Sequence, residues 1–165
     1  MLGDVMVGSS EAMKLAREFE VANQEVLELA RSCSDAQWSS LCEAERWSVG
    51  VLIDHIADSN VLIEGGVKSY LRKEEVPFTP AMVDAHNAEH AAEYASVSRD
   101  EAVRRLEDSI AKMVQTVRSL SDDELGITMP LLLVGGAPTS TAGLIKIVTD
   151  HVRLHLPSAQ RALSG

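Results

Sequence analysis

Residues 103–120 read VRRLEDSIAKMVQTVRSL, and this stretch decides the fold class. Its apolar residues recur at intervals of three and four, which is the spacing of one face of an α-helix. They are Val103, Leu106, Ile110, Met113, Val117 and Leu120. Ser98-Arg99-Asp100-Glu101 stands just before the stretch and has the form of a capping box, so the sequence predicts a helix that begins there.

The same helical spacing recurs along most of the chain. A stripe between Leu15 and Cys33 predicts one long helix, and Ser48 is placed to cap a second. Thr79, as N-cap before Pro80, predicts a short third helix.

The last long helix is predicted to begin near Ser140 and to run toward Leu163. Pro157 lacks a backbone donor, so we expect a kink or a break there. Ser34-Asp35-Ala36-Gln37 and Ser121-Asp122-Asp123-Glu124 predict short accessory turns, and residues 126–139 form one long connection. Strand alternation is not convincing anywhere, so the sequence predicts an all-α bundle of four main helices.

Length and charge narrow the class of protein. We expect one domain over residues 1–165, since this length supports one substantial core. No apolar run reaches membrane-spanning length, and no signal peptide is evident. Cys33 and Cys42 fit no metal-ligand pattern and are expected to be reduced thiols. We therefore expect a cytoplasmic protein. The net charge of −10 disfavours nucleic acid as a partner. A homodimer is expected because small bundles often bury a helix face that way.

Three histidines are the strongest functional signal. His151 and His155 are spaced i, i+4, so both imidazoles project from one side of the last helix. His55 lies on the apolar stripe of the second helix. A lone histidine on such a face is most often a buried residue with a satisfied nitrogen, but three together are costly to bury without a common partner. Three imidazoles can hold one divalent metal ion and leave positions open.

Depth along the helices sets a condition on this site. His55 lies seven residues after Ser48, roughly 10 Å along the axis, and His155 and His151 lie roughly 12–18 Å from the end of the last helix. The three imidazoles therefore meet only if the two helices run antiparallel.

A second i, i+4 pair, His86 and His90, lies on the short third helix among polar neighbours. We expect a solvated or pocket-rim face there, with Asn87, His86 and His90 as candidate substrate-binding residues. Asp54 and Asp150 each precede a candidate ligand, and we expect both at the surface, since neighbours on a helix diverge by about 100°.

Residues 47–57 read WSVGVLIDHIA and resemble the Trp-Ser/Thr…His-Leu/Ile-Ala signature of the DinB-like superfamily. The chain is particularly similar to the N-terminal domains of mycothiol-dependent maleylpyruvate isomerases. Residues 83–89, VDAHNAE, resemble the Asp-x-x-Asn segment of their third helix, and His151-x-x-x-His155 matches the ligand pair of their last helix. The resemblance spans about residues 9–163.

This resemblance implies a four-helix bundle of up-down-down-up topology, in which the second and fourth helices are antiparallel. It implies zinc or nickel on His55, His151 and His155, and mycothiol or bacillithiol as a thiol cofactor or co-substrate.

We therefore expect a metal-dependent enzyme that carries out S-transfer or isomerisation on a small electrophile. The alternatives are a metal-dependent hydrolase and a non-enzymatic helical interaction module. The sequence predicts no catalytic residue beyond the three ligands.

Overall fold

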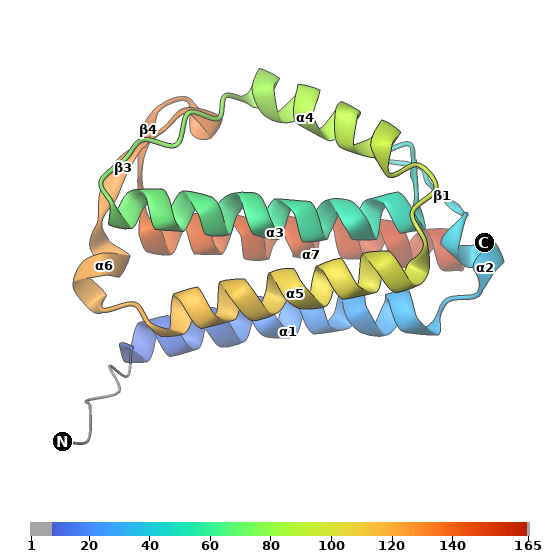
Figure 1. Cartoon of the computed structure of the whole chain (residues 1–165), viewed down its shortest axis with the longest axis horizontal. Helices are drawn as coiled ribbons and strands as arrows, with labels where there is room; N and C mark the ends of the chain where they lie inside the picture. Colours follow the sequence, from blue (N-terminus) through green and yellow to red (C-terminus); the bar gives the residue numbers. More distant parts are fainter. Residues whose placement is uncertain (1–7, 165) are drawn as a thin grey trace.

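The computed structural model describes residues 8–164, and four long helices form its body. They are α1 (Ser10–Ser32), α3 (Val49–Leu71), α5 (Arg99–Arg118) and α7 (Thr141–Leu163). Figure 1 shows that α1 and α7 run in one direction and that α3 and α5 run in the other. The order along the chain is thus up-down-down-up, and the predicted all-α bundle is confirmed.

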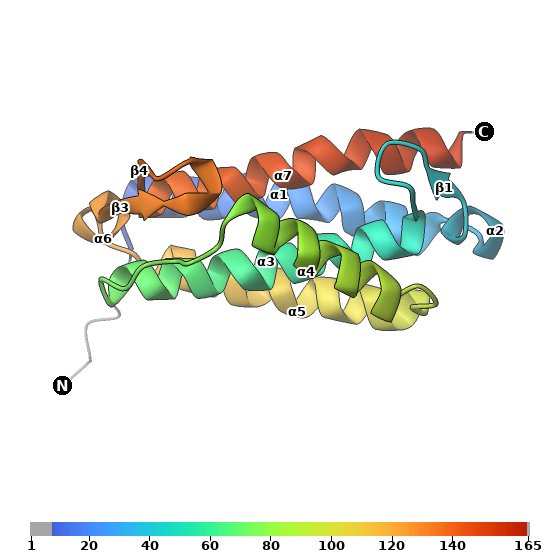
Figure 2. The same ribbon diagram turned by 90° about the horizontal axis from the view of Figure 1, so that it is seen from above.

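Each long helix packs against two others, since α3 and α1 both contact α5 and α7. The pair that carries the three histidines, α3 and α7, is antiparallel, as the depth condition requires. The connection between the parallel helices α3 and α5 contains α4 (Pro80–Glu93). Figures 1 and 2 together show α4 lying outside the bundle and crossing over α3.

Short elements close the two ends of the bundle. The helical ones are α2 (Asp35–Trp38), α6 (Asp122–Gly126) and a 3-10 turn, η1 (Leu132–Val134). The strand β1 (Leu41–Cys42) pairs with β2 (Trp47–Ser48), and β3 (Thr128–Leu131) pairs with β4 (Ala137–Ser140). Residues 126–139 form the predicted long connection, but the expectation that the chain has no strand is wrong, because this segment folds back as a hairpin. Gly135 and Gly136 make the return at φ values of 72° and 78°, which glycine adopts without steric cost.

The core is formed by the stripes that the sequence predicts. In α5, Leu106, Met113 and Val117 are fully buried, while Val103 at the helix start is only half-buried. One polar cluster crosses this core: the Asn60 amide donates to Asn23 Oδ1 at 2.9 Å and to Ser109 Oγ at 3.2 Å. Among the residues that the structure describes, no helix is both long and apolar enough to cross a membrane.

The N-caps predicted at Ser48 and Thr79 and the helix start predicted near Ser140 are confirmed. Ser48, Thr79 and Ser140 each accept a hydrogen bond from a backbone N–H in the first turn of the helix that follows. Of the kink or break expected at Pro157, the break is absent, because α7 continues to Leu163. Pro157 is exposed, and the packing of Leu156 and Ala159 on either side of it holds the helix against the core.

Candidate metal centre

His55 projects from the second turn of α3. The helix begins after Ser48, whose Oγ accepts a hydrogen bond from the Val51 backbone N–H at 3.2 Å. This cap and the apolar residues around it turn His55 toward the core, where its side chain is 2% exposed. Trp47, just before the helix, lies against the His55 ring with 5.0 Å between ring centroids.

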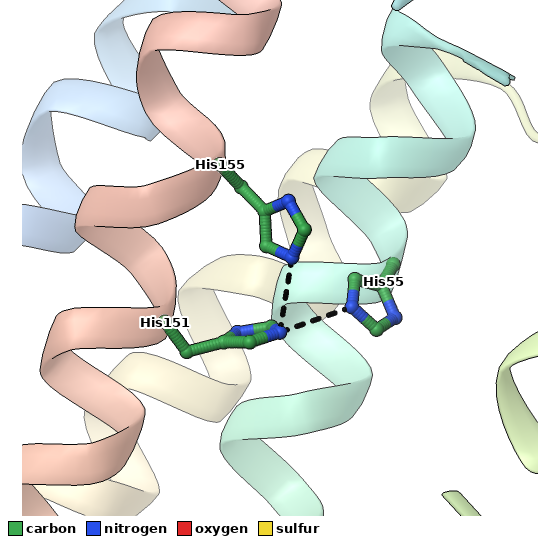
Figure 3. A group of neighbouring side chains, drawn as sticks. All are labelled: His55, His151 and His155. Atoms are coloured by element: carbon green, nitrogen blue, oxygen red, sulfur yellow. Dashed lines mark hydrogen bonds between the residues drawn. The ribbon is translucent and has the colours of Figure 1, made fainter. Parts of the chain in front are cut away.

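His151 and His155 project from one face of α7 toward His55 (Figure 3). The Nε2 atom of His151 lies 3.2 Å from Nε2 of His55 and 3.1 Å from Nε2 of His155. One ring nitrogen from each residue lies within 4.8 Å of the other two. The structure thus brings together the three imidazoles that the sequence singles out.

These separations fit a shared metal ion. Two imidazole nitrogens bound to one tetrahedral zinc at 2.0–2.1 Å are about 3.3 Å apart. The two short Nε2–Nε2 distances lie close to that value. Neutral imidazoles that face one another through Nε2 offer lone pairs to a common point, which is a donor set that a cation would complete.

The protonation state also suits a metal site. Burial, together with the neighbouring histidines, lowers the pKa of His55 from 6.5 to about 3. Burial and His155 lower the pKa of His151 to about 4. Both rings are therefore neutral at physiological pH, and only neutral imidazole binds a metal.

Glu45, in the loop between β1 and β2, supports His155 from behind. Its Oε1 lies 2.9 Å from His155 Nδ1, and its Oε2 accepts a hydrogen bond from the Ser158 hydroxyl at 2.5 Å. Burial acts to raise the pKa of Glu45, but the hydrogen bonds from Ser158 and His155 outweigh it, so this pKa is lowered. An ionised Glu45 holds the proton of His155 on Nδ1 and leaves Nε2 free to face the other imidazoles.

The sequence prediction missed Glu45. It lies 110 residues from His155 in the chain, so no local spacing could have indicated the contact.

Asp54 and His90 depart from the sequence prediction. Asp54 is fully buried rather than at the surface, and His90 is 4% exposed rather than on a solvated face. Asp54 Oδ2 lies 2.9 Å from His90 Nε2 and Oδ1 lies 3.1 Å from Arg105 Nε, so the buried carboxylate lies between these two side chains. The prediction failed because α4 and α5 both pack on the side of α3 that Asp54 faces. Asp150 is exposed, as predicted.

His86 and Asn87 occupy different positions on α4. His86 Nε2 lies 2.6 Å from Asp58 Oδ2 on α3, which makes a second contact between these helices. Asn87 lines a cavity of about 100 Å³ that also has His55 and His151 in its wall. The substrate-binding roles of His86, His90 and Asn87 stay predictions, and of the three only Asn87 lines this cavity.

The family model of the DinB superfamily matches residues 18–158. This chain belongs to the DinB superfamily. A search of curated proteins gives no match.

Two solved structures share the superfamily fold with this chain. One is YfiT from Bacillus subtilis, described as a probable metal-dependent hydrolase with an unusual four-helix bundle topology. YfiT is 15% identical in sequence to this chain, and the TM-score is 0.76. The match covers 93% of this chain and 87% of YfiT. The other is the mycothiol-dependent maleylpyruvate isomerase, 20% identical, with a TM-score of 0.71. That match covers 90% of this chain but only 59% of the isomerase.

Proposed function

We propose that this protein is a metal-dependent enzyme whose zinc or nickel ion is held by His55, His151 and His155. The observation that carries the proposal is the convergence of three ring nitrogens at 3.1 and 3.2 Å, two of them on imidazoles whose lowered pKa keeps them neutral. A bound ion would act as a Lewis acid that lowers the pKa of a coordinated thiol or water.

The leading candidate reaction uses a low-molecular-weight thiol of the mycothiol or bacillithiol type. None of the side chains that line this cavity is acidic, so the cavity wall offers the nucleophile no carboxylate base. A free thiol has a pKa of about 8.5 and bulk water one of 15.7, so a thiol needs the smaller shift to become a nucleophile. The fold shared with a mycothiol-dependent isomerase supports this choice.

The thiol must come from outside the chain. Both cysteines are buried, and burial, with Glu45 nearby, raises the pKa of Cys42 to about 11. Neither cysteine is therefore placed to act as the nucleophile.

The chain's own residues would hold the electrophile. The apolar side chains of the cavity wall lie on the same side of the site as His55 and His151. Ser59 and Asn87, in the same wall, offer uncharged hydrogen-bonding groups that can orient a carbonyl oxygen. S-transfer or isomerisation on a small electrophile is the reaction that this arrangement supports best.

Hydrolysis is the second candidate, and one observation favours it. The match to YfiT covers 87% of that chain, whereas the match to the isomerase covers 59%. YfiT is described as a probable hydrolase, and water would then replace the thiol as nucleophile.

A non-enzymatic helical module is less well supported. The apolar stripe of α5 that could have served such a module packs inside the bundle. The homodimer and the cytoplasmic location stay predictions of the sequence.

A thiol titration of the cobalt-substituted protein separates the two enzymatic candidates. We expect an ultraviolet absorption band that grows with added bacillithiol, that is lost in His151→Ala and that persists in His86→Gln, whose imidazole lies outside the triad. The absence of any band, together with ester hydrolysis by the same preparation, would contradict thiol chemistry and support the hydrolase.

A further inference from the structure

Helix α4, which lies outside the bundle (Figures 1 and 2), is attached to α3 mainly through polar contacts. His90 is its only buried residue, and Val83, in the first turn, is half-buried. Two aspartate–histidine pairs one turn apart join the helices, namely Asp58 with His86 and Asp54 with His90. Because α4 buries little apolar surface, it gains less from packing than the long helices and separates from its support more easily.

The C-terminal end of α4 is firmly held. The buried His90 ring lies 2.9 Å from the fully buried Asp54 carboxylate. The ring of Tyr94, at the end of the helix, stacks on the His90 ring with 4.7 Å between centroids. The Arg105 guanidinium lies 4.1 Å from the centre of the Tyr94 ring and also contacts Asp54. The last turn of α4 is therefore fixed to both α3 and α5.

The N-terminal end of α4 is held more loosely. Asp58 Oδ2 lies 2.6 Å from His86 Nε2, but these side chains are 18% and 42% exposed, so water competes for the contact. The apolar contacts at this end come from Phe78 and Val83, which are only half-buried. In the described part of the chain, no hydrogen bond between backbone groups joins residues 75–78 to another segment. The start of α4 can therefore separate from α3 while its last turn stays in place.

This loosely held end covers the cavity beside the three histidines. Phe78, Val83 and Asn87 form one part of the cavity wall, and the rest belongs to α3, α7 and η1. The cavity has a volume of about 100 Å³, whereas sites for small molecules commonly have about 300–1,000 Å³. A thiol and an electrophile together need more room than this, so the cavity has to enlarge before both reach the histidines.

We propose that α4 is a lid over the three histidines, hinged at its last turn and opened at its first turns. The contact between Asp58 and His86 is the latch. Val76 is 5% exposed, so the segment before the lid stays attached to the core at that residue. Opening moves the lid's part of the cavity wall away from α3 and α7. This inference rests on the proposed function for the reactants that enter, whereas the motion itself needs no metal.

The test labels a cysteine introduced beneath the lid of the metal-free protein. Val148, on α7, lines the cavity and is 1% exposed, so Val148→Cys reacts with a maleimide-linked fluorophore only when the site opens. Cys33 and Cys42 are buried outside the cavity and report global unfolding. We expect Val148→Cys to react at least about tenfold faster than either native cysteine. Equal rates for all three would overturn the proposal, because the cavity would then open only by unfolding.

Two substitutions in the Val148→Cys protein test the latch. Asp58→Ala removes the carboxylate that holds His86, and we expect the labelling rate to rise by about tenfold while the native cysteines react as before. Asp84→Ala is the matched control, because Asp84 is an exposed carboxylate on the same helix, and the rate should not change. Equal rates in the two variants would contradict the latch.

Hydrogen exchange of the unaltered protein gives a second measurement that needs no variant. We expect the backbone amides of residues 84–87 to exchange at least about tenfold faster than those of residues 90–93. Uniform protection along α4 would contradict a hinge at its last turn. Failure of the proposed function would instead appear as absence of metal binding in a protein whose lid still moves.

Discussion

Glu45 is the residue whose role is most open to a direct test. It contacts His155 Nδ1 and the Ser158 hydroxyl, so it orients a proposed metal ligand without lining the cavity. We predict that Glu45→Gln lowers metal affinity by about 10- to 100-fold, because a neutral amide no longer raises the basicity of His155. Competition with a chromophoric chelator measures this affinity.

A control for Glu45 lies in the same loop. Glu43 is exposed, and Glu43→Gln should leave the affinity unchanged. If both variants bind metal equally well, the contact between Glu45 and His155 does not tune the site.

Stability of the metal-free protein should depend on His55 and His151. Their pKa values are about 3 and about 4 in the fold and ordinarily 6.5, so below pH 6.5 the unfolded chain binds protons that the folded protein does not. We predict that the free energy of unfolding falls as the pH drops from about 6.5 toward 4, by up to about 1.4 kcal/mol per pH unit for each histidine.

Urea unfolding at a series of pH values measures this slope. The double variant His55→Gln, His151→Gln should show a flatter dependence. The same slope in both proteins would mean that other groups cause the loss of stability.

For single residues, the sequence predicts the direction of a side chain where that direction depends on spacing within one helix. The i, i+4 relation of His151 and His155 is local, and the apolar stripe indicates the direction of His55. Asp54 was misplaced because its burial depends on α4, which crosses over α3 through a connection whose path the sequence does not show. Glu45 was missed because its contact with His155 joins segments 110 residues apart in the chain.

At the scale of the helices, Asp54 links three of them. It lies on α3 and contacts His90 on α4 and Arg105 on α5. We predict that Asp54→Asn lowers the free energy of unfolding by about 1–3 kcal/mol, since it removes the buried carboxylate that faces His90 and the partly exposed Arg105. Chemical denaturation measures the change.

The chain provides a matched control for Asp54. Asp150 also precedes a candidate ligand, but it is exposed and paired only with Arg153 on the surface. Asp150→Asn should change stability by less than about 0.5 kcal/mol. Equal effects of the two substitutions would contradict the role of Asp54 as a link between helices.

Pro157 interrupts the hydrogen bonding of α7 without ending the helix. Because the residue is exposed, alanine fits there and restores a backbone donor. We predict that Pro157→Ala raises the free energy of unfolding by roughly 1–3 kcal/mol. Urea unfolding tests this, with Leu154→Ala, a substitution of a 72% exposed residue on the same helix, as the neutral control.

Elements with strong periodicity or caps are predictable from the sequence, and short paired elements are not. The capping boxes at Ser34 and Ser121 both form. The strands β3 and β4 of the hairpin have only four residues each, which is too short for a clear alternation of apolar and polar residues. An apolar stripe indicates which face is buried but not which short segment covers the end of a bundle.

At the scale of the whole molecule, the topology makes the site possible. The up-down-down-up order places α3 and α7 antiparallel, which brings a residue near the start of one helix beside residues near the end of the other. A metal bound between them links segments about 100 residues apart and should stabilise the fold, by about 2.7 kcal/mol at a free metal concentration of 100 times Kd.

The most direct test of the central claim is the metal content of the purified protein, measured by elemental analysis of the native chain and of His55→Ala. We predict one zinc or nickel ion per chain in the native protein and less than a tenth of that in the variant, with circular dichroism showing that both remain helical. A full complement of metal in folded His55→Ala, or a native protein that binds none when zinc is supplied, would contradict the account.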